Sequence, residues 1–257
     1  MRVNYLFIFS TECSSEGQAL LAGERAVYVR EQHEVYEGLS LAVVIEGRGR
    51  GTGVVSSVQG EQVSIQFQVT SAPPAPCPSR CLIGLPRPQT VKKVLELCAA
   101  LGVDELHFVA SELGQKSYQS STVFEEGELR RLMVKGAEQG GEWRLPKVVV
   151  HSHLKKCLAE ICPLVQSGVH PARQTTELLL LADTEASFDS SLNKVPRAPG
   201  AAVLLAVGPE AGWSMEERQM LVTRGFLSIS LGSRVLRVEQ ALAFVFGQVA
   251  LYLARET

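Results

Sequence analysis

Four of the ten residues from Thr70 to Ser79 are prolines, and this stretch constrains the fold more than any other feature of the sequence. Proline has a fixed φ and no backbone N–H, so such a run neither continues a helix nor forms a central strand, and it favours extended geometry. We therefore expect two parts, residues 1–72 and residues 73–257. The chain of 257 residues is long enough for each part to bury a core of its own.

The first part has the pattern of a small β domain. Short apolar runs and alternations over residues 39–45 and 62–69 indicate strands. Between them, the segment 47–53 carries glycine at every second position, which predicts a hairpin tip or a bulged loop. Its two arginines, Arg48 and Arg50, either belong to an ordinary hairpin tip or contact phosphate groups.

The second part alternates helical and strand patterns. Helical periodicity occurs over residues 91–101, 129–138, 153–165, 216–223 and 239–255. Apolar runs typical of strands occur over residues 106–109, 148–150, 178–181, 201–207 and 227–231. Because these strands are apolar on both faces and alternate with helices, we predict a parallel α/β sheet, in which ligands bind at the carboxyl ends of strands.

The charge balance limits the partners that the chain attracts. Lys and Arg number 25 against 27 Asp and Glu, and the net charge is −3 over residues 1–72 and +1 over residues 73–257. A nucleic-acid partner would therefore need a local basic surface, because Lys and Arg contacts to phosphate supply most non-specific affinity. Several basic residues are most simply solvated helix faces, but in a dimer they could form one basic stripe: Arg87, Lys92, Lys93, Arg130, Arg131, Lys135, Lys155 and Lys156.

The six cysteines predict no metal site. The pairs Cys77/Cys81 and Cys157/Cys162 lack the tight spacing of a zinc knuckle and have prolines beside them. Buried thiols explain Cys98 and the two cysteines of the 153–165 helix best.

Two histidines, His151 and His153, would face the same side of a strand, which suggests a metal pair. No third ligand lies at close spacing, and a strand end that enters a helix is the better explanation of both.

The sequence has no apolar stretch that approaches the 18 residues of a membrane span, and its N-terminal apolar run of five residues is shorter than a signal-peptide core. We therefore expect a protein of the reducing cytoplasm with no membrane partner.

Two strand ends have the composition of ligand-binding loops. Residues 207–214 leave a strand through glycines and enter a helix at Ser214, where Glu217 completes a predicted capping box. Residues 231–239 leave the next strand and enter the last helix. Glycines let backbone amides approach a ligand, and a helix N-terminus favours an anionic group. Ordinary βα turns remain an alternative explanation.

The two loops resemble the paired signature of RsmE-type enzymes, through Gly208-Pro209-Glu210-x-Gly212 with Ser214-x-x-Glu217, and Leu231-Gly232-x-Arg234-Val235-Leu236-Arg237-x-Glu239. Further matches lie upstream, at Leu101-Gly102-Val103, Ser111-Glu112 and Ala137-Glu138-Gln139-x-Gly141-x-x-Arg144-x-Pro146. That family methylates uracil N3 in 16S ribosomal RNA with S-adenosylmethionine. The resemblance covers most of residues 81–250.

The resemblance implies a SPOUT-type parallel sheet with a C-terminal trefoil knot, preceded by a PUA-like β-barrel domain that binds RNA, in a homodimer that acts on small-subunit ribosomal RNA or the 30S subunit. The cofactor residues it implies are Asp183, Glu185, Gly208, Glu210, Gly212, Leu231, Gly232 and Leu236. Methyl transfer needs N3 deprotonated, so Glu239 would accept the proton and Arg237 would stabilise the uracil oxygen anion. The RNA-binding candidates are Arg48, Arg50 and Arg144.

Four positions beside these motifs depart from the family pattern: Ala211 replaces a glycine, Ser233 a proline, and Val238 and Gln240 two threonines. These replacements, with the acidic first part, keep a second hypothesis open. The chain would then be a catalytically weakened or inactive family member that acts as an RNA-binding or ribosome-assembly protein. An unrelated small-molecule enzyme is disfavoured, because the sequence has no nucleophile elbow, P-loop or dinucleotide fingerprint.

Overall fold

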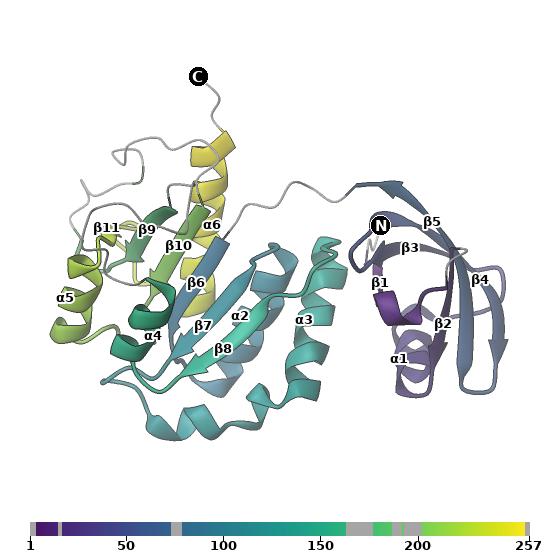
Figure 1. Ribbon diagram of the computed structural model, residues 1–257, viewed down its shortest axis with the longest axis horizontal. Coiled ribbons are helices and arrows are strands. Elements are labelled where there is room, and N and C mark those ends of the chain that lie inside the picture. The colour runs from purple at the N-terminus through teal and green to yellow at the C-terminus, as the bar shows by residue number, and fades with distance from the viewer. Residues whose placement is uncertain are drawn as a thin grey trace. The chain divides into compact units, whose positions relative to one another are not determined.

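The computed structural model describes residues 4–14, 17–72, 79–162, 177–186, 192 and 202–254 (Figure 1). The chain divides into two compact units. The first comprises Met1–Pro76, Cys98–Gly102 and Arg131–Leu145, and the second comprises Cys77–Leu97, Val103–Arg130 and Pro146–Thr257. Most of the proline-rich stretch, residues 73–78 with Cys77, lies outside the described residues.

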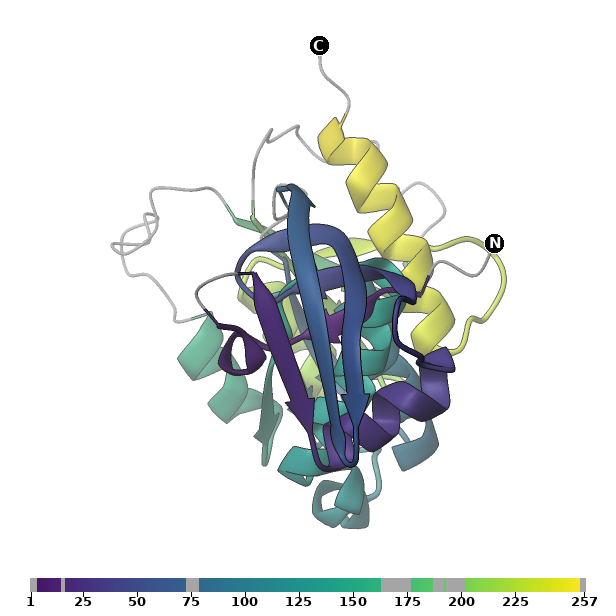
Figure 2. The same ribbon diagram turned by 90° about the vertical axis from the view of Figure 1, so that its right-hand side faces the viewer.

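The first unit is built on a curled five-stranded sheet of order β1-β3-β4-β5-β2 (Figure 2). Its strands are β1 Leu6–Ile8, β2 Gln18–Ala22, β3 Ser40–Ile45, β4 Gly49–Gln59 and β5 Gln62–Ser71. β1 pairs with β3 in parallel and the other pairs are antiparallel. The strands predicted over 39–45 and 62–69 are thus confirmed.

The sequence analysis missed one helix of this unit, α1 Glu24–His33. Only Ala26 and Val29 of this helix are buried, so its apolar stripe is too narrow to give a helical period. The short 3-10 helix η1 Ser10–Glu12 precedes β2. A core of apolar side chains from all five strands and α1 completes the unit.

The glycine-rich segment 47–53 is only partly a hairpin tip. The turn between β3 and β4 contains Gly47, whose φ is +73°, but β4 already begins at Gly49. A Cβ on Gly51 would lie 2.0 Å from the carbonyl oxygen of Gln68, and the β4–β5 register shifts next to it. The later glycines therefore permit close strand packing and a bulge inside the sheet.

A buried carboxylate connects two segments of the first unit. Glu138, in helix α3 Glu126–Gly140, is 5% exposed and accepts hydrogen bonds from the Phe7 N–H at 3.1 Å and the Tyr28 hydroxyl at 2.6 Å. Burial raises the pKa of Glu138, although these two hydrogen bonds act in the opposite direction. Burial and the bond to Glu138 raise the pKa of Tyr28.

The second unit contains a six-stranded sheet of order β11-β9-β10-β6-β7-β8, and every neighbouring pair is parallel. Its strands are β6 Ser79–Gly84, β7 Glu105–Val109, β8 Lys147–His151, β9 Glu177–Ala182, β10 Ala202–Val207 and β11 Leu227–Ile229. The predicted parallel α/β sheet is confirmed. Central strand β6 was missed, because its short apolar run directly follows the prolines.

The predicted helices of this region are also found, as α2 Pro88–Ala100, α3, α4 Leu154–Ile161, α5 Met215–Thr223 and α6 Val238–Ala254. The predicted helical residues 163–165 and 255 lie outside the described residues. Two 3-10 helices, η2 Lys116–Ser120 and η3 Thr122–Phe124, precede α3. Side chains of α4 and α5 share a core with β6, β7, β9 and β10, and Figure 1 shows α2 on the opposite face of the sheet from α4.

Two expectations about composition can be compared with the described residues. Their five cysteines, at positions 13, 81, 98, 157 and 162, are free. Cys98 and Cys157 are buried as predicted, whereas Cys162, also predicted to be buried, is only half-buried because it lies just after the end of α4. In the part of the chain that the structure describes, no helix is long and apolar enough to cross a membrane.

Candidate ligand-binding site at the strand ends

Three strands of the second unit end at the same level. In the sheet register, Ala182 at the end of β9 lies opposite both Val207, at the end of β10, and Ile229, at the end of β11. The segments that follow these strands, which begin at residues 183, 208 and 230, therefore start side by side at the carboxyl edge of the sheet, where parallel sheets bind ligands. They include the loops predicted over 207–214 and 231–239.

The loop after β10 is tight and rich in backbone contacts. Gly212 has a φ of +76° and donates its N–H to the Pro209 carbonyl at 2.8 Å. A Cβ on Gly208 would lie 3.2 Å from the backbone of Gly212, so a side chain there would press the turn open. Among the described residues, Glu34 is the one non-glycine residue with a positive φ, so Ala211 is accommodated without strain.

The predicted capping box at the start of α5 is confirmed and belongs to a larger network. The Glu217 backbone N–H donates to Ser214 Oγ at 3.1 Å, and the Ser214 N–H donates to Glu217 Oε2 at 3.0 Å. Glu217, only 1% exposed, also accepts from Ser111 Oγ at 3.1 Å and the Glu112 N–H at 3.0 Å. The Ser214 hydroxyl donates to Glu112 Oε2 at 2.6 Å. This network joins the loop after β7 to the loop after β10.

Glu210 connects the same loop to α2. Its Oε1 accepts hydrogen bonds from the Arg87 backbone N–H at 3.2 Å and the Thr90 hydroxyl at 3.0 Å. The carboxylate thus lies at the N-terminus of α2, where the exposed N–H groups and the helix dipole favour negative charge. In this arrangement its side chain holds the loop.

The loop after β9 is held by an arginine that the sequence analysis missed. Arg218 of α5 forms ion pairs with Asp183, at 2.6 Å, and with Glu185. Asp183 is 8% exposed at its side chain, accepts the Glu185 N–H at 3.0 Å, and donates its own N–H to the Ile229 carbonyl. A local sequence motif cannot predict these ion pairs, because they connect α5 to the end of a strand more than thirty residues earlier in the chain.

The loop after β11 is more exposed than the other two. Gly232 has a φ of +104°, and Val235 is 87% exposed. Leu231 and Leu236 are half-buried. The loop ends at Arg237, the residue before the first turn of α6. The Arg237 N–H donates a hydrogen bond to Gln240 Oε1 at 3.1 Å.

Glu239, in that first turn, accepts a hydrogen bond from Lys93 Nζ at 3.0 Å and is 17% exposed at its side chain. Burial alone would raise the pKa of Glu239, but a backbone hydrogen bond, Lys93 and the charge of Arg237 lower it below its usual value. The carboxylate is therefore ionised at neutral pH. Lys92, the neighbour of Lys93, pairs with Glu128 at 3.0 Å.

The three arginines proposed for RNA contact lie in the first unit and differ in their contacts. Arg50 donates to the Gly140 and Gly141 carbonyls at 2.9 and 2.7 Å, which ties β4 to the end of α3. Arg144 lies over the Trp143 ring and 3.6 Å from Glu142. Arg48 is exposed at the hairpin turn.

The strand-end site combines groups suited to a polar organic ligand. The glycines of two loops let the backbone approach a ligand closely, while Arg237 and Glu239 add one charge of each sign. An open groove of about 540 Å³ between α4 and α5 is a separate feature, and none of the predicted site residues lines it.

The chain is similar to known proteins both in sequence and in structure. Residues 73–250 match the family described as "RNA methyltransferase domain". The chain is 28% identical over 164 residues to Ribosomal RNA small subunit methyltransferase E of Treponema pallidum, and 20% identical over 245 residues to the protein of that name from Synechocystis. These alignments cover 64% and 95% of this chain, and 58% and 77% of the relatives. The chain thus spans less than two thirds of the Treponema protein.

Two solved structures share the fold over nearly the whole chain. One is a ribosomal RNA small subunit methyltransferase E from Neisseria gonorrhoeae bound to S-adenosyl methionine, with a TM-score of 0.74 and 17% identity, covering 96% of this chain and 98% of that one. The other is a methyltransferase from Legionella pneumophila in complex with the same cofactor, with a TM-score of 0.75 and 20% identity, covering 96% and 97%.

Proposed function

The chain belongs to the RNA methyltransferase domain family, and from this premise we propose that it is an S-adenosylmethionine-dependent methyltransferase acting on uracil N3 of 16S ribosomal RNA. The observation that carries the proposal is the family match over residues 73–250, which contains all three aligned strand ends. The names of the relatives above describe methyltransferases, and none describes a non-catalytic RNA-binding protein. The hypothesis of an inactive family member therefore has no support.

We assign cofactor binding to the three loops at the strand ends. Gly208, Gly212 and Gly232 allow backbone amides to approach the ligand, and Leu231 and Leu236 supply half-buried apolar surface. Asp183, Glu185 and Glu210 act by holding the loops, through Arg218 and the start of α2. When bound, S-adenosylmethionine supplies an electrophilic methyl group on a sulfonium.

Arg237 and Glu239 carry the chemistry in this proposal. Glu239 accepts the N3 proton of uracil, and Arg237 stabilises the negative charge that develops on a uracil oxygen. The new bond joins N3 to the methyl carbon while the bond from that carbon to sulfur breaks, so the products are N3-methyluracil in RNA and S-adenosylhomocysteine. The ion pair with Lys93 keeps Glu239 ionised and available to accept the proton.

The finer architecture of the family extends the proposal. The sheet order β11-β9-β10, with the loop after β11 leading into α6, is compatible with the proposed C-terminal trefoil knot. The curled sheet of the first unit supports a PUA-like domain over residues 1–72, with Arg48 at its RNA surface. Arg144, in the Arg131–Leu145 segment of the same unit, is a further RNA-binding candidate. Exposed apolar side chains of α6, Phe244 and Leu251, support a homodimer. The free cysteines suit a cytoplasmic location.

Methyl transfer to small ribosomal subunits tests the activity directly. The full chain is incubated with labelled S-adenosylmethionine and 30S subunits that lack the modification, and nucleosides are then separated and identified by mass spectrometry. We expect labelled N3-methyluridine at one position, and no label in subunits that already carry the modification. Absence of transfer at high enzyme concentration would refute the proposed activity.

A further inference from the structure

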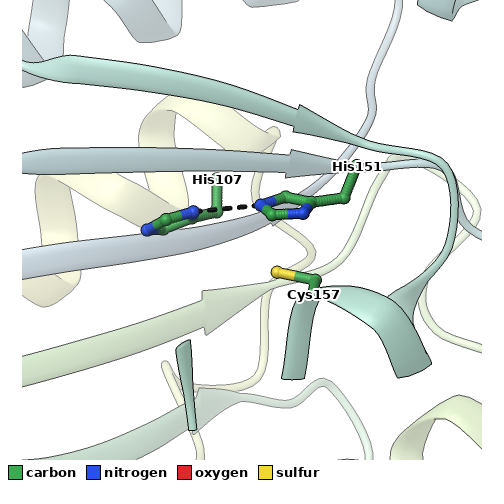
Figure 3. Close-up of side chains that lie close together, drawn as sticks. All are labelled: His107, His151 and Cys157. Atoms are coloured by element: carbon green, nitrogen blue, oxygen red, sulfur yellow. Dashed lines mark hydrogen bonds between the residues drawn. The ribbon is translucent and has the colours of Figure 1, made fainter. Parts of the chain in front are cut away.

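Three buried side chains from separate elements of the second unit meet on the face of the sheet that α4 covers (Figure 3). His107 lies on β7, His151 at the end of β8, and Cys157 in α4. The two imidazoles are 4% exposed and Cys157 is fully buried. His107 Nδ1 and His151 Nε2 are 3.1 Å apart. One ring nitrogen of each histidine and Cys157 Sγ all lie within 4.8 Å of one another.

The outward nitrogens of both rings face carboxylates. His107 Nε2 lies 3.1 Å from Glu105 Oε2, and His151 Nδ1 lies 3.5 Å from Glu160 Oε2. Glu105 accepts a hydrogen bond from His107 Nε2, so the neutral His107 ring carries its N–H there and its Nδ1 is a lone-pair acceptor. His151 Nε2 then donates its N–H to His107 Nδ1 in the metal-free chain. The two inward nitrogens, His107 Nδ1 and His151 Nε2, therefore share one proton.

A metal ion can take the place of this shared proton, because it binds both inward lone pairs at once. The N–H of His151 then moves to Nδ1, which lies 3.5 Å from Glu160 Oε2. Metal-bound histidines commonly donate their other N–H to a carboxylate, which is the relation that Glu105 and Glu160 have to these rings.

We propose that His107 Nδ1, His151 Nε2 and Cys157 Sγ bind one zinc ion, which fastens α4 to the edge of the sheet. Two nitrogens and one sulfur are a ligand set that zinc prefers. Two nitrogens bound to tetrahedral zinc lie about 3.3 Å apart, close to the 3.1 Å observed here. A nitrogen and a sulfur bound to zinc lie about 3.6 Å apart, and because the ligand atoms already lie within 4.8 Å of one another, binding needs a shift of Cys157 Sγ by about 1 Å at most.

The charges around the cluster also suit a divalent cation. Binding releases the thiol proton of Cys157, and the zinc thiolate unit then carries one net positive charge. Glu105 and Glu160 lie next to the two imidazoles and offset that charge. The fourth zinc position is left for water or an exogenous ligand. This site is separate from the strand-end loops and does not depend on the proposed methyl transfer.

Sequence patterns predict no metal here, because the ligands are far apart in the chain. The pairs that lie close in the sequence are His151 with His153 and Cys157 with Cys162. In the structure His153 precedes the first turn of α4 and contacts Ser152 Oγ, while His151 turns to His107. The proposal therefore replaces the expectation that the chain has no metal site.

Titration of the metal-free full chain with Zn²⁺, and with Co²⁺ as a coloured substitute, tests the proposal. We expect one equivalent of Zn²⁺ per chain and, with Co²⁺, a thiolate charge-transfer band and the strong visible absorption of tetrahedral cobalt. Cys157→Ser should remove the band and weaken Zn²⁺ binding at least 100-fold. The control Cys162→Ser, five residues further along, should keep both. Glu105→Gln, which keeps the ligands but changes their orientation, should weaken binding by about 10–100-fold.

Circular dichroism of each variant shows whether it folds. A wild-type chain that binds no Zn²⁺, or that gives a Co²⁺ spectrum without a thiolate band, would overturn the proposal whatever the variants do. Equal Zn²⁺ affinity of folded Cys157→Ser and Cys162→Ser would also overturn it.

Discussion

Replacement of Glu217 by alanine should destabilise the second unit by about 3–5 kcal/mol. The carboxylate is 1% exposed and accepts hydrogen bonds from Ser111 Oγ, the Glu112 N–H and the Ser214 N–H. The hydroxyl can rotate toward another acceptor, but the two N–H groups are fixed. A hydrogen bond to a charged group contributes about 1.5–3 kcal/mol, and a buried donor left unpaired costs about 1–3 kcal/mol. Two fixed donors therefore account for most of the expected loss.

Urea unfolding followed by circular dichroism measures this change in the free energy of unfolding. The matched control is Glu216→Ala, which removes the exposed carboxylate next to Glu217 in the first turn of α5 and should cost at most about 0.5–1 kcal/mol. Glu217→Gln keeps one acceptor oxygen and should fall between the two variants. A loss below about 1 kcal/mol in Glu217→Ala would refute the claim that this network holds the two loops together.

Three further predictions concern the site and the first unit. Arg218→Ala should weaken binding of S-adenosylhomocysteine about tenfold by calorimetry, because it frees the two carboxylates after β9, whereas Gln219→Ala should leave it unchanged. Lys93→Ala should raise the pKa of Glu239, because it removes the ion pair that favours the charged carboxylate. As the pH falls, methyl transfer by this variant should therefore begin to decline at a higher pH than in the wild type. An unchanged pH profile would exclude Glu239 as the proton acceptor. Burial raises the pKa of Glu138, so its ionisation as the pH rises above 4.5 opposes folding. Glu138→Gln should therefore lose less stability over this pH range than the wild-type chain. If the free energy of unfolding, measured with urea at each pH, falls equally steeply with pH in both proteins, the prediction is wrong.

Strong periodicity explains which elements could be predicted from sequence. β10 is apolar at every position, and the start of α5 follows a capping box, so both were found within one or two residues. Helix α1 has a narrow apolar stripe and β6 directly follows prolines, so local patterns were too weak to find either. The order of strands in the sheet depends on which face of the sheet each crossover helix packs against. Local sequence patterns do not specify that face, so the order could not be predicted.

At the candidate site, the sequence predicts which glycines the loops need but does not predict the partners of the charged residues. Glycines at 208, 212 and 232 are recognisable because a tight loop requires them, and each takes part in a tight turn or has a positive φ. The partners of the charged residues are not recognisable, because Arg218, Lys93 and Thr90 lie on helices far along the chain from the groups they contact.

These partners change how the charged residues of the motifs are understood. Asp183, Glu185 and Glu210 would be expected to contact the cofactor if sequence alone were considered, yet each has its carboxylate bound to another element of the second unit. Such side chains contribute to binding by fixing the loops before the ligand arrives, which lowers the entropy lost on binding. Their loss should therefore weaken cofactor affinity through loop disorder, and a conservative replacement that keeps the hydrogen bonds, such as Glu210→Gln, should restore most of it. If Glu210→Gln binds S-adenosylhomocysteine as weakly as Glu210→Ala, the carboxylate's charge acts on the ligand directly and the positioning role is wrong.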